Sequence, residues 1–76
     1  MLKVKIVSNN IKACLKARKW TTPDLARRTG MPLSTLYYRM QHPGTFQAAE
    51  LMIIGHVLNI TLADIFGEDY EKRIAI

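Results

Sequence analysis

Residues 22–41, TPDLARRTGMPLSTLYYRMQ, begin with a strong signal for a short helix. Thr22 is the expected N-cap, Pro23 takes the first helical position, and Asp24 meets the positive end of the helix dipole. Gly30 is expected to end this helix at the C′ position, because glycine adopts a positive φ without strain. The stretch therefore opens with a helix of about two turns.

A second helix is predicted over residues 33–41, directly after Pro32. Its apolar residues recur at the i, i+3, i+4, i+7 spacing that gives a helix one buried face. The turn 42–44, His-Pro-Gly, then ends the helix. The apolar positions are Leu33, Leu36, Tyr37 and Met40.

The residues at the junction suit two helices that cross closely. Ala26 is small enough for the two backbones to approach, Gly30 tolerates the turn, and Met31 can fill the corner. Leu25 and Leu36 are expected to face the core from either side. This combination predicts a helix-turn-helix, in which a tight glycine-containing turn joins two short helices.

Apolar spacing predicts three more helices around this motif. One starts at an N-cap at Ser8 or Asn9 and runs toward Trp20. Another spans about 46–58, and a last one runs from an N-cap at Thr61 through residue 66. The fold class is therefore all-α, a compact five-helix bundle.

The chain is expected to form one domain over residues 1–76, with a helical core at 8–67 and tails at 1–7 and 68–76. Apolar and basic residues alternate over 2–7, and isoleucines alternate at the end, 74–76. A period of two is typical of strands, so short terminal β-strands are expected as an alternative for the tails.

The charge is divided unevenly along the chain. Residues 1–45 hold nine basic residues and one acidic residue, a net +8, whereas residues 46–76 hold two basic and five acidic residues, a net −3. Such asymmetry suits a polyanionic partner that approaches from one side.

Several classes of function are disfavoured. A single cysteine, Cys14, permits no intrachain disulfide or cysteine-based zinc site and is expected to be buried. Neither His42 nor His56 has acidic or cysteine partners at catalytic or metal-binding spacing, and no glycine-rich phosphate loop occurs. The longest apolar run, 51–60, is too short to cross a bilayer. We expect a cytoplasmic protein that is not an enzyme, with no cofactor, metal, small-molecule ligand or membrane association.

The stretch from residue 20 to 66 resembles the Cro/XRE-type (lambda-repressor-like) helix-turn-helix family. The resemblance rests on LARRTGMPLSTL at 25–36 and VLNITLADIF at 57–66. The segment STLYYRM at 34–40, with the proline and the Glu-Leu pair that follow it, is similar to small prophage regulators of Gram-positive bacteria. The chain departs from the family pattern with Thr22 in place of glutamine and Arg39 in place of an aliphatic residue.

The resemblance implies a sequence-specific regulator of transcription, a phage or prophage repressor that reads the major groove of double-stranded DNA with helix 33–41. Ser34 can hydrogen-bond several bases, Gln41 can pair with adenine, and Leu33 can touch a thymine methyl group. Tyr37 has a half-buried packing role as its alternative. The positions that match groove-facing ones are Leu33, Ser34, Tyr37, Tyr38 and Gln41.

Phosphate contacts are expected from the surrounding cations and from the start of the second helix. For Arg28 and Lys19 the alternative is a solvated side chain, and for Arg39 it is an ion pair with Glu50. The expected phosphate-binding residues are Thr22, Arg27, Arg28, Lys16, Lys19 and Arg39.

One such unit reads only a few base pairs, so the resemblance also implies a homodimer on two half-sites, built from the C-terminal helix or the tails. The alternative function is a protein-interaction module on the same fold, antitoxin-like or anti-repressor. The operator sequence, and whether binding represses or activates, do not follow from the residues.

Overall fold

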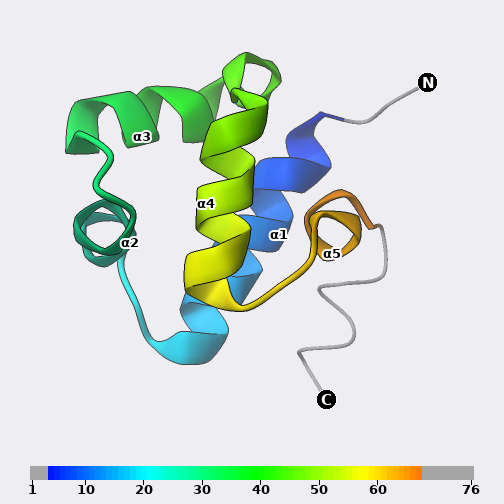
Figure 1. The fold of residues 1–76 in the computed structure, drawn as a ribbon, viewed down its shortest axis with the longest axis horizontal. Coiled ribbons are helices and arrows are strands. Elements are labelled where there is room, and N and C mark those ends of the chain that lie inside the picture. Colours follow the sequence, from blue (N-terminus) through cyan, green and yellow to red (C-terminus); the bar gives the residue numbers. More distant parts are fainter. Residues whose placement is uncertain (1–3, 68–76) are drawn as a thin grey trace.

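The computed structural model describes residues 4–67, which form five α-helices and one short 3-10 helix (Figure 1). No strand occurs among these residues, and the all-α prediction is confirmed. None of their helices has the length and apolar character needed to cross a membrane. The elements are α1 (Lys5–Arg18), α2 (Thr22–Thr29), α3 (Leu33–Gln41), η1 (Pro43–Thr45), α4 (Ala48–Leu58) and α5 (Leu62–Phe66).

Helix α4 occupies the middle of the molecule. In Figure 1 it passes in front of α1, with α2 and α3 to its left and α5 to its right. The contacts agree, since α2 packs on both α3 and α4, and α5 packs on both α1 and α4. All five helices contribute to the core, whose buried apolar residues are Val7, Ile11, Cys14, Leu15, Leu25, Ala26, Leu36, Met40, Leu51, Ile54, Leu58 and Ile65.

The start of α1 differs from the prediction. Residues 5–7 are helical, so the strand expected over 2–7 is wrong for them, and neither Ser8 nor Asn9 is the N-cap. The extra turn places Val7 on the same buried face as Ile11, and burial of that side chain outweighs the local alternation. The rest of the expected strands, at 2–3 and 74–76, and the tail at 68–76 lie outside the described residues.

Two buried polar side chains connect α1 to other helices by hydrogen bonds. The Ser8 hydroxyl donates to the Met40 carbonyl oxygen at 2.7 Å, which ties α1 to the end of α3. The Asn10 amide donates to three carbonyl oxygens at the end of α5, those of Asp64 (3.1 Å), Ile65 (2.7 Å) and Gly67 (2.8 Å). The last turn of α5 is therefore capped by a side chain of α1.

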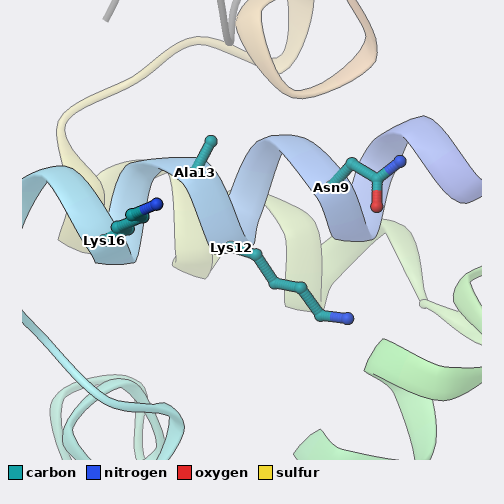
Figure 2. Close-up of a pocket in the computed structure, with 4 residues that line it drawn as sticks. All are labelled: Asn9, Lys12, Ala13 and Lys16. Carbon is teal, nitrogen blue, oxygen red and sulfur yellow. The ribbon is translucent and has the colours of Figure 1, made fainter. Parts of the chain in front are cut away.

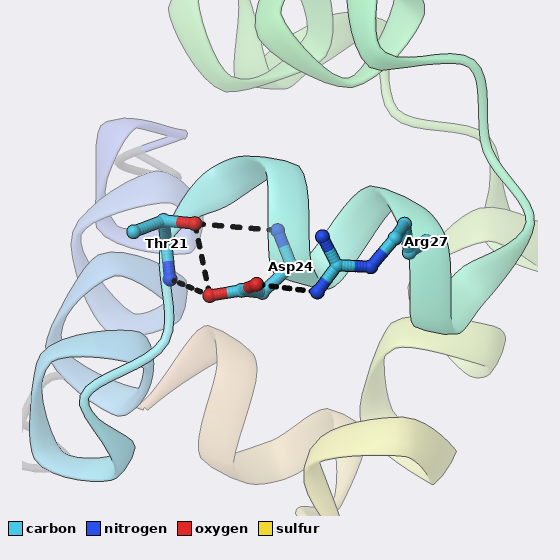
Figure 3. Close-up of polar contacts among 3 residues, drawn as sticks. All are labelled: Thr21, Asp24 and Arg27. Carbon is cyan, nitrogen blue, oxygen red and sulfur yellow. Dashed lines mark hydrogen bonds and ion pairs between the residues drawn. The ribbon is translucent and has the colours of Figure 1, made fainter.

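Helix α2 starts with a capping box (Figure 3). The Thr21 hydroxyl accepts from the Asp24 backbone N–H at 3.3 Å, and the Asp24 carboxylate accepts from the Thr21 N–H at 2.8 Å. Thr21, not Thr22, is thus the N-cap, because its spacing to Asp24 satisfies two backbone donors at once. Thr22 becomes the first helical residue and Pro23 the second, where a missing N–H still costs no helical bond.

The later helix ends follow the sequence more closely. Helix α4 begins at Ala48, two residues later than predicted, because residues 43–45 form η1. Asn59 ends it with a φ of 56°, in the left-handed region that asparagine tolerates. The predicted N-cap of α5, Thr61, forms a capping box with Asp64.

Candidate nucleic-acid interface

The turn between α2 and α3 has the predicted geometry. Gly30 has a φ of 77°, and its N–H donates to the Ala26 carbonyl oxygen at 3.0 Å. Ala26 is buried where the helices approach, and Met31 packs against the core. The Thr29 hydroxyl adds two hydrogen bonds that sequence reasoning missed. It donates to the Leu25 carbonyl oxygen at 2.9 Å and accepts from the Met31 N–H at 3.3 Å.

Helix α3 has one buried and one exposed side. Leu36 and Met40 lie in the core. The five residues predicted to face the groove are all exposed, and their spacing of i, i+1, i+4, i+5 and i+8 places them on one continuous face. They are Leu33, Ser34, Tyr37, Tyr38 and Gln41. We call this the α3 face.

The α3 face carries two aromatic side chains, Tyr37 and Tyr38, and both are exposed. Tyr37 is 46% exposed and Tyr38 52% exposed, so Tyr37 is half-buried, as its packing alternative expects, and its contact with a base stays a prediction. The Tyr38 ring lies 4.7 Å from the His42 ring, at an interplanar angle of 42°. This contact restricts Tyr38 while its surface stays open to a partner.

Arg39 lies beside the α3 face and is paired. Its Nε donates to Glu50 Oε1 at 3.1 Å and to Oε2 at 3.4 Å, and both side chains are largely buried. Glu50 also accepts from the Gln47 backbone N–H at 2.8 Å. The structure thus shows the ion pair that was one of two alternatives for Arg39, whose contact with a phosphate stays a prediction.

Arg27 lies on the outer surface of α2 beside the capping box (Figure 3). Its Nη2 is 2.6 Å from Asp24 Oδ1, yet its side chain is 70% exposed. The pKa of Asp24 falls from 3.8 to about 2, mainly because its carboxylate accepts from the Thr21 backbone N–H, with further contributions from the Thr21 hydroxyl and from Arg27. Arg27 keeps other N–H donors that no contact uses, so it remains able to bind a phosphate.

Arg28 lies over an aromatic ring. Its guanidinium is 4.1 Å from the centroid of the Trp20 ring, and the Arg18 guanidinium is 5.4 Å from the same centroid. Arg18 also donates to the Leu58 carbonyl oxygen. The cation–π contacts join the end of α2 to the end of α1, and the Arg18 hydrogen bond joins α1 to the end of α4. Arg28 thus has a packing role that its sequence position did not reveal.

A row of lysines on α1 extends the basic surface. Lys5, Asn9, Lys12 and Lys16 recur at i, i+4, i+7 and i+11, and all four are exposed. Figure 2 shows Asn9, Lys12 and Lys16 on successive turns along a shallow hollow. A neighbouring hollow is lined by Lys5, Asn9 and Lys12 of α1 together with Gln41 of α3. We call Lys5, Asn9, Lys12 and Lys16 the α1 stripe. Because Gln41 lines the second hollow, the stripe reaches the C-terminal end of the α3 face.

The α1 stripe carries uncompensated charge. Helix α1 holds no acidic residue, and within residues 4–67 no ion pair engages its lysines. Only Lys16 of this stripe was predicted to bind a phosphate. Asn9 and Lys12 lie within the helix predicted toward Trp20, so their spacing to Lys16 was detectable, whereas the strand expected over 2–7 concealed Lys5. Lys19, also predicted, is exposed at the C-cap of α1 with a φ of 59°.

Two crossing helices, of which the second has one exposed face, next to a row of lysines that form no ion pair within residues 4–67, define a helix-turn-helix nucleic-acid-binding domain. A family model described as a Cro/C1-type HTH DNA-binding domain matches residues 10–68, which is more than half of the chain. The chain belongs to this family and is a DNA-binding protein, as the resemblance implied. Comparisons with curated proteins and with solved structures found no match.

Proposed function

We propose that this chain is a sequence-specific regulator of transcription, a phage or prophage repressor of the cytoplasm that reads double-stranded DNA as a homodimer. The observation that carries the proposal is the α3 face, a continuous exposed surface without a charged residue that lies next to the α1 stripe. Major-groove readout needs polar and methyl-contacting side chains on one helix face, with cations beside it for the phosphates.

The residues of the α3 face have distinct proposed roles. Gln41 forms two hydrogen bonds with adenine, Ser34 donates to or accepts from several bases, and Leu33 contacts a thymine methyl group. Tyr38 uses its hydroxyl on a base or a phosphate. Tyr37, at the centre of the face, contacts the edge of a base.

Phosphate binding is proposed for the cations on and around the α3 face. Lys12, which lines a hollow together with Gln41, and Lys16 one turn further along α1 are the proposed main contacts, because both are exposed and neither forms an ion pair within residues 4–67. Lys5 and Lys19 continue the surface on either side of them. The N-terminal end of α2 at Thr22 supplies the contact expected of a helix dipole, and the Arg27 side chain supplies a second phosphate contact. Arg28 and Arg39 contribute if they exchange their present partners for a phosphate.

The salt dependence of DNA binding tests this proposal. If each protomer neutralises about five phosphates, log K falls against log salt with a slope of about −4 to −5 per bound protomer, which is about −9 for the proposed dimer. Fluorescence anisotropy of a labelled duplex measures the slope directly. The double variant Lys12→Ala/Lys16→Ala should reduce its magnitude by about 2 per protomer, whereas Lys12→Arg/Lys16→Arg should leave it unchanged. An affinity that does not depend on salt rejects the proposal.

The homodimer is proposed because one α3 face spans too few base pairs for useful specificity. Two copies on half-sites about one helical turn apart double the surface that is read. Gel filtration and footprinting test this part. A monomer that protects one unpaired half-site would contradict it.

A protein-interaction module is the second candidate function. Leu33, Tyr37 and Tyr38 leave apolar and aromatic surface exposed on α3, and tyrosine is enriched in protein interfaces. The double variant Arg27→Ala/Ser34→Ala discriminates between the two. It abolishes retention on DNA if α3 reads DNA, and it leaves capture of a protein partner largely intact if α3 is a protein-binding surface.

A further inference from the structure

Helix α4 has an exposed apolar face opposite its buried one. Met52 is 61% exposed and Ile53 43% exposed, and Ala49 and His56 are exposed one turn to either side. Leu51, Ile54, Gly55 and Leu58 form the buried side. We call Ala49, Met52, Ile53 and His56 the outer face of α4. A helix that is apolar on both sides is typical of one that is covered on both sides.

The outer face of α4 also holds no aspartate, glutamate, lysine or arginine. The only acidic or lysine or arginine residue of α4 is Glu50, which is held by Arg39 and is largely buried. A surface of this kind offers nothing to a polyanion. It does suit a second copy of a chain with a net charge of +5, because two such copies repel least where neither presents a lysine or an arginine.

The spacing of the outer face is symmetric. Residues 49, 52, 53 and 56 lie evenly about the midpoint between 52 and 53, at the i, i+3, i+4, i+7 positions of one stripe. If two α4 helices pack antiparallel about a two-fold axis, Met52 of each meets Ile53 of the other, and Ala49 meets His56. The small alanine opposite the larger imidazole makes the stripe complementary to itself, as an isologous interface requires.

We infer that the outer face of α4 is a self-association surface, on which a second copy of this chain packs with its α4 antiparallel to the first. The surface is small, and interfaces below about 1,200 Å² in total belong to weak complexes. The dimer is therefore expected at micromolar or higher concentrations. This assignment gives the proposed homodimer a surface on α4, in place of the C-terminal helix or the tails that the resemblance implied. It concerns the protein without DNA and can be tested separately.

Sedimentation velocity of the full chain without DNA tests the inference. The wild type should shift from 8.7 kDa toward twice that mass as its concentration rises. Met52→Glu should weaken the association by about tenfold or more, because each interface then buries two carboxylates. Glutamate is a good helix former, and circular dichroism checks that the variant keeps its helices.

Leu62→Glu on α5 is the matched control. Leu62 is also exposed, at 44%, and a glutamate in the first turn of α5 suits its helix dipole. This variant should dimerise like the wild type. The inference is overturned if the wild type stays monomeric at millimolar concentration, if Met52→Glu dimerises normally, or if Leu62→Glu alone abolishes the dimer.

Cross-linking tests the antiparallel packing. The double variant Ala49→Cys/His56→Cys should form a covalent dimer under mild oxidation, because the two positions meet across the axis. Either single variant should not, because its two cysteines lie about 10 Å apart along the helices, beyond the reach of a disulfide. Native Cys14, 3% exposed, contributes little. Equal cross-linking of single and double variants, or none in the double, contradicts the packing.

The two proposals fail in different ways. Met52→Glu keeps the α3 face and the α1 stripe, so it should bind a non-specific duplex at low salt like the wild type. If the wild type does not bind a duplex but does dimerise, the proposed function is contradicted and the inferred self-association surface is not. A wild type that binds DNA but never dimerises would overturn only this inference.

Discussion

Arg39 and Glu50 join the outer side of α3 to the first turn of α4 through a partly buried ion pair, in which Arg39 Nε donates to both carboxylate oxygens at 3.1 and 3.4 Å. Glu50 at the same time closes the capping box of α4 by accepting from the Gln47 N–H. One carboxylate therefore both starts α4 and holds α3 against it. The pair thus adds to the core contacts of Leu36 and Met40 in holding α3 in place.

Replacement of Glu50 should destabilise the fold. Glu50→Ala removes the acceptor of the cap and leaves the Arg39 guanidinium without its partner, which together should cost about 2 kcal/mol. Glu50→Gln keeps an acceptor at the capping position and should cost about half as much. Urea denaturation measures both, with m unchanged. A loss for Glu50→Ala within the error of the wild-type measurement would contradict this role.

Asn10 should be among the most sensitive polar residues of the chain. Its amide is 1% exposed and supplies the carbonyl groups at the end of α5 with their donors. Asn10→Ala should cost about 2–3 kcal/mol, because those carbonyl oxygens lose their partner at a site that is buried at Ile65 and partly buried at Asp64 and Gly67. Asn10→Asp should cost more at pH 7, since its carboxylate would face three carbonyl oxygens.

Asn9→Ala is the control for Asn10→Ala, because Asn9 occupies the preceding position of α1 but its side chain is exposed. Its effect on the free energy of unfolding should lie within about 0.5 kcal/mol of zero. Equal losses for the two alanine variants would mean that the Asn10 contacts to α5 do not stabilise the fold.

The lowered pKa of Asp24 makes the free energy of unfolding depend on pH in the acid range. Its pKa in the folded state is about 2, below the ordinary 3.8, so the folded state favours the carboxylate. The resulting stabilisation is complete above about pH 4 and is lost as the pH falls through 3.8 toward 2. Asp24→Asn has no such titration. The difference in Tm between wild type and Asp24→Asn should be constant from pH 5 to 7 and change below pH 4, whereas a difference that stays constant down to pH 2 would count against the capping carboxylate.

Gln41 should affect specific binding more than non-specific binding. Gln41→Ala removes two proposed hydrogen bonds to adenine, and a bidentate contact of this kind is worth about 1–3 kcal/mol of discrimination. Anisotropy titrations with a selected duplex and with a scrambled one should show the loss only for the selected duplex. An equal loss on both would instead mean that Gln41 contributes to backbone contacts or to the fold.

Local signals were enough to predict the motif, because its determinants lie within a few residues of one another. The bounds of α3, the positive φ of Gly30 and the buried Leu25 and Leu36 all follow from spacing and steric preference. The cap of α2 was misplaced by one residue because Thr21 and Thr22 are both good N-caps, and only the geometry of the box with Asp24 distinguishes them.

Contacts across the fold were beyond sequence reasoning. The Asn10 amide reaches carbonyl groups more than 50 residues away, and no local pattern marks it. The Arg28–Trp20 contact likewise depends on how α2 meets the end of α1. Arg39 could be assigned two partners from its position, and the choice between them required the packing of α3 on the start of α4.

The central claim is that the α3 face reads a specific sequence in double-stranded DNA. Selection from a pool of random duplexes tests it most directly, with the bound fraction sequenced over successive rounds. The account predicts enrichment of one motif with two inverted half-sites whose centres lie about 10 base pairs apart, and its loss in the Ser34→Ala/Gln41→Ala variant. A pool that stays random under wild-type selection, although the protein is folded, would contradict the account.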